Sequence, residues 1–250
     1  MRVKYFALVL LSTFMCCNIT SAQYRKISAL VYTSPDTYHN QSIPTAITQL
    51  KVMAERNFVD LTWTQLESSF TDKNLANFNV IIFLHSNDTK LNAEQMESFQ
   101  KYIQGGGGFV GIHAASVNKG QNEWFKKLVG CTFIRHPEKQ TGVMTVEDKN
   151  FPATMHLPDK WVWTDEWYEY GDALTENQHV LLSADESTYT VEVGMGKNHP
   201  VSWYQEYDGG RSFYTGLGHL ESAYNDPLFM SHIFGGIYWS AKGKGITKQK

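Results

Sequence analysis

The chain has 250 residues, 42% of them hydrophobic, and its 22 lysines and arginines against 25 aspartates and glutamates give a formal net charge of −3. A chain of this length can bury the core of one sizeable domain. Its acidic balance argues against nucleic acid as a partner, because phosphate groups are bound by basic surfaces.

The N-terminus predicts an export signal over residues 1–22. Arg2 and Lys4 provide a positive start, "YFALVLLSTFMCC" is an apolar core too short to span a bilayer, and small residues up to Ala22 offer a cleavage site. A lipoprotein signal is the weaker alternative, because no small-residue box precedes the cysteines. We therefore expect an exported, periplasmic protein whose mature chain, residues 23–250, has no transmembrane segment.

Cleavage after Ala22 would remove Cys16 and Cys17 and leave Cys131 as the remaining cysteine. No intramolecular disulfide is then possible, so the fold must depend on its core. Loss of two basic residues lowers lysine plus arginine from 22 to 20 against 25 acidic residues, which makes the net charge −5. Because the local sequence offers Cys131 no activating base, we expect a buried structural thiol.

The first half alternates strand and helix signals, which predicts an α/β fold with a mainly parallel sheet and helices on both faces. Ser42 is an N-cap candidate for the first helix, and Asn92 with Gln95 forms a capping-box pattern at the second. The expected strands are 26–32, 58–64, 78–86 and 109–113, and the expected helices are 42–57 and 92–104.

The second half predicts an added β-rich part. Segments 141–150, 179–185 and 200–218 read as strands, with a hairpin turn at Asp208, Gly209 and Gly210. A final helix is expected over 227–241, where two adjacent glycines allow close packing or a kink. Because no repeat, linker or change in composition interrupts the chain, residues 23–250 are expected to form one domain.

Histidines follow several of the predicted parallel strands. In an open parallel sheet, ligands bind outside the carboxyl ends of the strands, and His39, His85 and His113 fall at or beyond such ends. In "GGGGFVGIHAAS" a glycine run feeds a strand, and small residues after His113 would expose its side chain. His113 is thus a candidate metal ligand, general base or proton donor; the alternative is a histidine that only holds the turn.

Polar side chains of the second half are the candidate partners. "WTDEWYEY" sets Asp165 and Glu166 among Trp161, Trp163, Trp167, Tyr168 and Tyr170, either as a sugar platform or as a packing seam with solvated charges. Neighbours on a strand point to opposite faces, so these two carboxylates are not an acid/base pair with each other. The further candidates are His136, His219, Glu221 and Tyr224.

These residues also contain the ligand types that a divalent metal needs. Zinc or a similar ion takes about three or four histidine, cysteine or carboxylate ligands, and His39, His113, Glu166 and His219 could supply them from different strand ends. The chain contains no short metal-binding motif that would settle this. The remaining histidines have other expected places: His199 shapes a turn, and His156, His179 and His232 lie on the surface or on a helix face.

Several segments, in order, resemble the trehalose-utilisation, or ThuA-like, family over roughly residues 26–241. They are "YHNQSIPTAI", "FNVIIFLH", "GGGGFVGIHAAS", "WFKKLVG" followed by "RHP", "LPDKWVWTDEWY", "HPVSWYQEYDGGRSFYTGLGH" and "HIFGGIYWS". The resemblance implies a flavodoxin-like fold related to class I glutamine amidotransferases. In those enzymes a cysteine nucleophile stands where this chain has His113, so glutaminase activity is disfavoured.

The resemblance also implies a role in the use of trehalose-type disaccharides, through keto-sugars made by a partner sugar dehydrogenase. The family positions that match here as pocket residues are His39, His113, His136, Asp165, Glu166 and His219.

Our main hypothesis is an exported enzyme that acts on a disaccharide, glycoside or keto-sugar by hydrolysis, isomerisation or elimination. His113, Glu166 and His219 are its predicted catalytic residues, and a divalent metal is its predicted cofactor, with His39, His113 and His219 as ligands. The predicted substrate-binding residues are His39, His136, Asp165, Trp167, Tyr168 and Glu221. The alternatives are a non-catalytic sugar-binding or accessory protein, or a structural partner with a large apolar surface.

Overall fold

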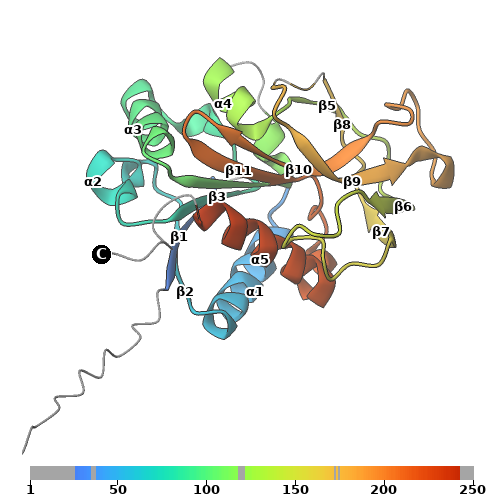
Figure 1. Cartoon of the computed structure of the whole chain (residues 1–250), viewed down its shortest axis with the longest axis horizontal. Coiled ribbons are helices and arrows are strands. Elements are labelled where there is room, and N and C mark those ends of the chain that lie inside the picture. Colours follow the sequence, from blue (N-terminus) through green and yellow to red (C-terminus); the bar gives the residue numbers. More distant parts are fainter. Residues whose placement is uncertain (1–25, 35–37, 118–121, 172, 174, 243–250) are drawn as a thin grey trace, which may run out of the picture.

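The computed structural model describes residues 26–34, 38–117, 122–171, 173 and 175–242, so the expected signal over residues 1–22 lies outside the described residues. The fold is a nine-stranded mixed sheet between helices, with a small two-stranded sheet beside it (Figure 1). The strands of the large sheet are β1 (Ile27–Tyr32), β2 (Val59–Thr64), β3 (Val80–Leu84), β4 (Gly108–Ile112), β6 (Gln140–Val146), β7 (Lys160–Asp165), β9 (His179–Asp185), β10 (Pro200–Tyr207) and β11 (Gly210–Thr215). The small sheet consists of β5 (Phe133–Arg135) and β8 (Glu169–Tyr170).

The order of the large sheet separates a parallel half from an antiparallel half. The order is β2-β1-β3-β4-β11-β10-β9-β6-β7. The first five strands pair in parallel, and from β11 onward the pairs are antiparallel. This confirms the mainly parallel first part and the β-rich second half that the sequence predicts.

Helices cover both faces of the sheet, as the alternation of elements predicts. On one face α1 (Ser42–Arg56) and α5 (Pro227–Ala241) pack on Val31, Ile82 and Val110; on the other, α3 (Ala93–Gln104) and α4 (Glu123–Val129) pack on Ile81, Phe83 and Phe109. The short helix α2 (Asp72–Leu75) lies on the second face with α3. Successive side chains of a strand point to opposite faces, so one unbroken apolar run supplies both cores.

The predicted ends of the helices are partly right. Asn92 and Gln95 form the capping box of α3 with mutual bonds of 2.9 Å. The predicted cap at Ser42 is wrong: the N-cap of α1 is Gln41, and the Ser42 hydroxyl donates to the carbonyl of His39 instead. The element β5 and the helix α4 have no counterpart in the prediction.

The hairpin turn predicted at Asp208, Gly209 and Gly210 joins β10 and β11. Asp208 and Gly209 both have positive φ (49° and 88°), which is the mirror-image turn that matches the twist of paired strands.

His232, expected on the surface or a helix face, is fully buried in α5, and its Nδ1 bonds the carbonyl of Ala153 at 2.8 Å. Burial lowers the pKa of His232 to about 4, because the charged imidazole loses its hydration.

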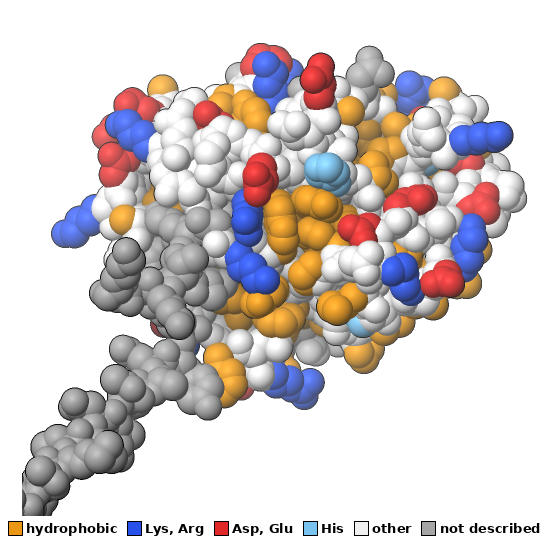
Figure 2. Space-filling model, in the orientation of Figure 1, with side chains coloured by type: hydrophobic (Ala, Val, Ile, Leu, Met, Phe, Trp, Pro, Cys, Tyr) orange, Lys and Arg blue, Asp and Glu red, His pale blue; other side chains and the backbone are white. Residues whose placement is uncertain are grey.

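One face of the molecule carries a partly apolar surface over α5, where orange side chains gather among charged ones (Figure 2). Tyr204, Phe234, Tyr238 and Trp239 are partly buried there against the core. Among the described residues, no helix combines the length and hydrophobicity that a membrane span requires.

Gly235 tests how tightly α5 packs. A Cβ at this position would lie 2.4 Å from the backbone of Ala153, so we expect Gly235→Ala to lower the free energy of unfolding by roughly 1–3 kcal/mol. Helix propensity alone predicts the opposite sign, since alanine is favoured over glycine. Urea unfolding of the variant beside Ser231→Ala, an exposed position of α5, measures the effect; equal or raised stability would contradict the close packing.

Candidate functional site

Histidines converge at the carboxyl edge of the parallel strands. His39 follows β1, His85 follows β3 directly, His113 follows β4 directly, and His219 lies four residues beyond the end of β11. His85 and His113 both adopt left-handed backbone conformations, with φ of 51° and 52°. Non-glycine residues avoid this region, at a cost of about 1–3 kcal/mol each, and such strain collects at functional sites.

His113 presents one particular nitrogen to the site. Its side chain is fully buried, and its Nδ1 lies 2.7 Å from the carbonyl oxygen of Gly216. Because a carbonyl only accepts, Nδ1 carries the proton, and in the neutral ring Nε2 has a free lone pair. The hydroxyl of Tyr168 lies 2.8 Å from Nε2, within donating distance. His113 is thus prepared to act as a base or as a metal ligand.

Glu166 joins three of the histidines. Its Oε2 lies 3.1 Å from Nδ1 of His219, 3.5 Å from Nε2 of His113 and 3.6 Å from Nε2 of His136. Burial alone would raise the pKa of Glu166, but hydrogen bonds and charge attraction from His113 and His219 outweigh it and hold the pKa far below its ordinary value. A protonated His113 donates from Nε2 to Glu166, whereas in the neutral ring the same nitrogen accepts from Tyr168. The site therefore contains an ionised carboxylate.

His39 and His85 form a stacked pair beside this group. Their ring centroids are 4.4 Å apart with an interplanar angle of 16°. Burial, and then the neighbouring His113, His39 and His219, lower the pKa of His85 well below its ordinary value, so its ring is neutral. The hydroxyl of Tyr224 bonds Nε2 of His85 at 2.9 Å, while Nδ1 is buried without a hydrogen-bond partner among the described residues.

Asp165 lies on the other side of its strand from Glu166. The fully buried Asp165 carboxylate accepts from the backbone N–H groups of Glu166, Gly218 and His219 at 2.8–3.1 Å, and from the Trp163 indole at 3.0 Å. Adjacent side chains therefore point in opposite directions, as the sequence predicts. Asp165 holds the loop that carries His219, while Glu166 faces the histidines.

A cavity of about 390 Å³, the histidine cavity, lies at this group and is lined in part by His39, His85, His136, Glu166 and His219, while the buried His113 is not in its lining. Its volume is within the size range of small-molecule sites. Its lining adds several residues that the sequence analysis did not single out, among them Tyr38, Asn87 and Lys90. Asn87 and Lys90 follow the end of β3, which is the signal that could have found them. The full lining is Ser34, Tyr38, His39, His85, Asn87, Thr89, Lys90, Ala114, Val117, Phe133, His136, Glu166, Tyr168 and His219.

Three of the predicted substrate-binding residues do not line this cavity: Asp165, described above, Trp167 and Glu221. Trp167 donates from its indole to the carbonyl of Gln140 and stacks on Tyr189, so it packs the strands rather than lining this cavity. Glu221 accepts a hydrogen bond from Thr45 of α1 at 2.6 Å. His136 and Tyr168 do line the cavity, and their rings stack at 5.6 Å.

Two groups of three side chains could hold a metal ion. They are His39, His85 and His113, and His113, Glu166 and His219; within each, the ligand atoms lie within 4.8 Å of one another. The lone pair of an imidazole nitrogen lies in the ring plane, and the stacked rings of His39 and His85 cannot both point at one ion without rotating. The rings of His113 and His219 meet at 67°, which favours the group that contains Glu166.

The protons of this favoured group also limit how it could bind metal. Nζ of Lys139 lies 3.5 Å from Nε2 of His219; when it donates there, Nδ1 of His219 keeps its proton and donates to Glu166. Coordination through Nδ1 would move that proton to Nε2, and the exposed Lys139 would have to turn away. Two imidazoles and one carboxylate are a ligand set that suits zinc and leaves an open position.

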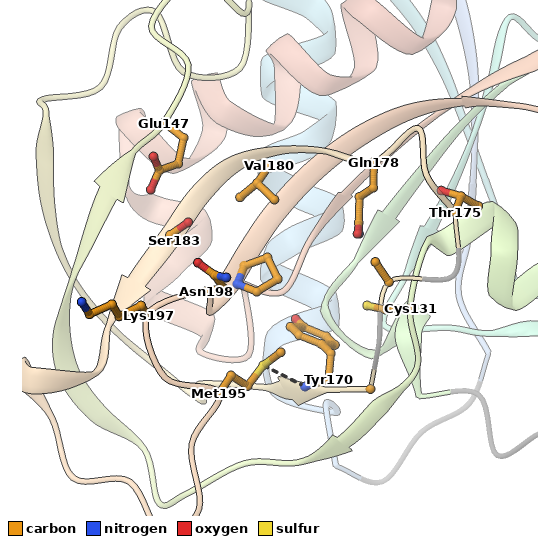
Figure 3. Close-up of a pocket in the computed structure, with 13 residues that line it drawn as sticks. Cys131, Glu147, Tyr170, Thr175, Gln178, Val180, Ser183, Met195, Lys197 and Asn198 are labelled. Carbon is orange, nitrogen blue, oxygen red and sulfur yellow. Dashed lines mark hydrogen bonds between the residues drawn. The ribbon is translucent and has the colours of Figure 1, made fainter.

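A second, larger cavity of about 710 Å³ lies between the antiparallel half of the sheet and the loop that contains Met195 (Figure 3). Met195 lies over Tyr170, whose backbone N–H donates to its sulfur, and Cys131 lies beside them. Cys131 is buried, and burial raises the pKa of its thiol well above the ordinary value, so it is the inert thiol that the sequence predicts. No histidine is among its described lining residues.

The fold and the histidine cavity define an amidotransferase-like α/β protein with histidine at the strand turn. The family model described as ThuA, trehalose utilisation, matches residues 28–240, and the chain belongs to this family. A ThuA-like protein from Bacteroides uniformis has a similar structure, with a TM-score of 0.75 and 26% identity, over 88% of this chain and 94% of the other. No curated protein matches the chain.

Two further structures support the fold. A ThuA-like protein from Parabacteroides merdae has a TM-score of 0.73 and 22% identity, over 90% of this chain and 93% of the other. A GMP synthase-like protein from Thermoplasma acidophilum has a TM-score of 0.57 and 12% identity, over 90% of this chain and 100% of the other. At these identities the likeness concerns the fold alone.

The lowered pKa of Glu166 makes a pH-dependent stability difference testable. Above the ordinary glutamate pKa of about 4.3 the wild type should be more stable than Glu166→Gln, because its carboxylate is held ionised by His113 and His219. As the pH falls below that value, the unfolded carboxyl binds a proton and the folded one does not, so the difference should shrink. Urea unfolding between pH 3.5 and 7 measures it.

Glu166→Asp, which keeps an ionisable group, is the matched control and should retain the slope of the wild type. If the free energies of unfolding of wild type and Glu166→Gln differ by the same amount at every pH in this range, the result would contradict the shifted pKa.

Proposed function

We propose that this protein is an exported enzyme that processes a disaccharide, glycoside or keto-sugar in the histidine cavity, with a divalent metal such as zinc held by His113, Glu166 and His219. The observation that carries the proposal is the meeting of the buried His113 Nε2 with an ionised Glu166 and His219, two residues that line one small-molecule-sized cavity. Such a site can remove a proton from a sugar hydroxyl, or from the carbon beside a keto group, and return it.

His113 is the proposed centre of the chemistry. Its Nδ1–H is committed to Gly216, so Nε2 either takes the substrate proton or binds the metal. The Tyr168 hydroxyl, 2.8 Å from the same nitrogen, is placed to pass a proton on. Glu166 stabilises positive charge that develops on His113 and His219.

The ligand set supports the metal part of the proposal. A zinc or similar ion bound by two imidazoles and a carboxylate would polarise a sugar carbonyl or hydroxyl at its open position. This set replaces the predicted one, in which His39 stood in place of Glu166. His39 and His85 lie beside the group and shape the cavity instead.

Membership of a family described by trehalose utilisation supports a sugar as the substrate. Tyr38, 85% exposed, lies at the cavity and offers an aromatic face to the CH groups of a sugar ring. Asn87, Thr89 and Lys90 place amide, hydroxyl and ammonium groups along the same wall, where they could bond sugar hydroxyls. A partner dehydrogenase would supply a keto-sugar as the substrate. The export signal over residues 1–22 would direct the enzyme to the periplasm.

Glutamine hydrolysis fits the site poorly. The turn after β4 carries an imidazole, which does not form the thioester that this reaction requires. Cys131, the one cysteine among the described residues, is buried at the other cavity.

The metal is tested by elemental analysis of residues 23–250, purified without chelator or histidine tag. We expect close to one equivalent of zinc, manganese or iron, and its loss in His113→Ala. His179→Ala, an exposed histidine of β9 remote from the cavity lining, is the control and should keep the metal. Metal-free wild type would remove the metal from the proposal and leave acid/base catalysis by the same residues.

Turnover tests the catalytic part. A panel of disaccharides, glycosides and their keto-sugars is incubated with the protein, and products are followed by mass spectrometry. With a substrate in hand, His113→Gln should lower kcat by about 10²–10⁴-fold, the contribution expected of a placed acid/base group, while His156→Gln should not. Unchanged turnover in His113→Gln would contradict the proposal. Tight sugar binding without product would favour a sugar-binding protein.

A further inference from the structure

A buried histidine outside the cavity, His199, bonds the segment that contains Glu166 and Tyr168. Glu166 and Tyr168 both line the cavity and lie in the short segment between β7 and β8, so the backbone of this segment determines where both side chains stand. The carbonyl oxygen of Tyr168 lies 2.9 Å from Nε2 of His199, which is fully buried. His199 therefore bonds the same residue whose hydroxyl reaches His113.

The other nitrogen of His199 is bonded to a carboxylate. Its Nδ1 lies 2.8 Å from Oε1 of Glu186, whose side chain is 13% exposed. Hydrogen bonds from Met195, His199 and Gly196 outweigh the effect of burial and lower the pKa of Glu186, so this carboxylate only accepts. A carbonyl oxygen and a carboxylate oxygen are both acceptors, so the imidazole of His199 stands between two groups that accept hydrogen bonds.

The loop before His199 keeps this carboxylate in place. Glu186 accepts from the backbone N–H of Met195 at 2.5 Å and of Gly196 at 2.9 Å. Gly194 and Gly196 have positive φ, and a Cβ on Gly194 would lie 2.5 Å from Oε2 of Glu186, so the loop closes around the carboxylate only with glycine there. Figure 3 shows Met195, Lys197 and Asn198 of this loop along the larger cavity.

We propose that His199 and Glu186 are positioning residues that hold the Tyr168 hydroxyl on Nε2 of His113 and keep Glu166 in reach of His113 and His219. The proposal rests on the proposed function only in that it takes His113 as the working group. A histidine expected merely to shape a turn before a proline thus acts on the site through the carbonyl of Tyr168. Neither residue lines the histidine cavity.

The test is the ¹⁵N resonance of His113 Nε2 in histidine-labelled, metal-free protein. An unprotonated imidazole nitrogen shifts when a hydroxyl donates to it, and Tyr168→Phe supplies the shift that follows loss of that donor. The His113 signal is assigned by its absence in His113→Gln. We expect His199→Gln to move the resonance in the same direction by at least half as much, because both N–H donors of glutamine are on one nitrogen and cannot replace two separate ring nitrogens.

His232→Gln is the matched control, because it also removes a fully buried imidazole bonded to a backbone carbonyl but lies in α5, away from Tyr168. It should leave the resonance unchanged. A folded His199→Gln protein with an unchanged His113 resonance, whatever its loss of thermal stability, would overturn the positioning role.

Glu186→Gln is the second test of the positioning role, for the case in which His199→Gln does not fold. It keeps His199 and removes the anion, and we expect a shift in the same direction as in Tyr168→Phe; an unchanged resonance overturns the proposal. The readout needs neither turnover nor metal. Failure of the proposed enzyme function would therefore appear in the His113 activity assays and leave this result standing.

Discussion

The hydrogen bond from His113 Nδ1 to the carbonyl of Gly216 is the interaction on which the chemistry of the site depends. It selects one tautomer and leaves the lone pair on the nitrogen that faces Tyr168, Glu166 and His219. The bond exists because β4 and β11 are parallel neighbours in a register that pairs Ile112 with Thr215, so the residues that follow them stand side by side. Gly216 must be glycine here, since a Cβ would lie 2.1 Å from the Tyr170 hydroxyl. The register of one strand pair thus selects the tautomer of the neutral His113 ring.

Two adjacent carboxylates are hydrogen-bonded in different ways, and this separates their roles. Asp165 is saturated by four N–H donors, three of them from the backbone, so it has little capacity left for a ligand. Glu166 is held by side-chain imidazoles, which can exchange protons or turn toward a metal. The first arrangement fixes a loop and the second supplies a reactive group. Because adjacent side chains of a strand point in opposite directions, the neighbouring residues Asp165 and Glu166 can take these two roles.

Much of this arrangement follows from sequence pattern, up to the point where side-chain direction decides. Alternation of strands and helices predicts the parallel half, and the rule that ligands bind at carboxyl strand ends brings His39, His85 and His113 together. The elements β5, with three residues, and β8, with two, are too short for periodicity to detect. His232 was misplaced because α5 is apolar nearly all round, so no polar face marks its exposed side. Pattern also does not say which rotamer a side chain takes. His199 bonds the carbonyl of Tyr168, 31 residues away, and Trp167 donates to the carbonyl of Gln140, 27 residues away, instead of lining the cavity. This is why the predicted metal ligands included His39, whereas among the described residues it is Glu166 that forms a group with His113 and His219.

The turn after β4 explains how one scaffold can carry different chemistry. Its left-handed residue projects a side chain over the edge of the sheet, and this geometry belongs to the backbone rather than to the side chain. With cysteine such a turn presents a nucleophile that forms a covalent bond; with histidine it presents a base or a ligand. Cys131 cannot replace the missing thiolate, because it is buried at the other cavity and its pKa is raised. The groups beside His113 are an ionised carboxylate and a tyrosine hydroxyl near the same nitrogen, and these are the groups that the proposed proton transfer would use.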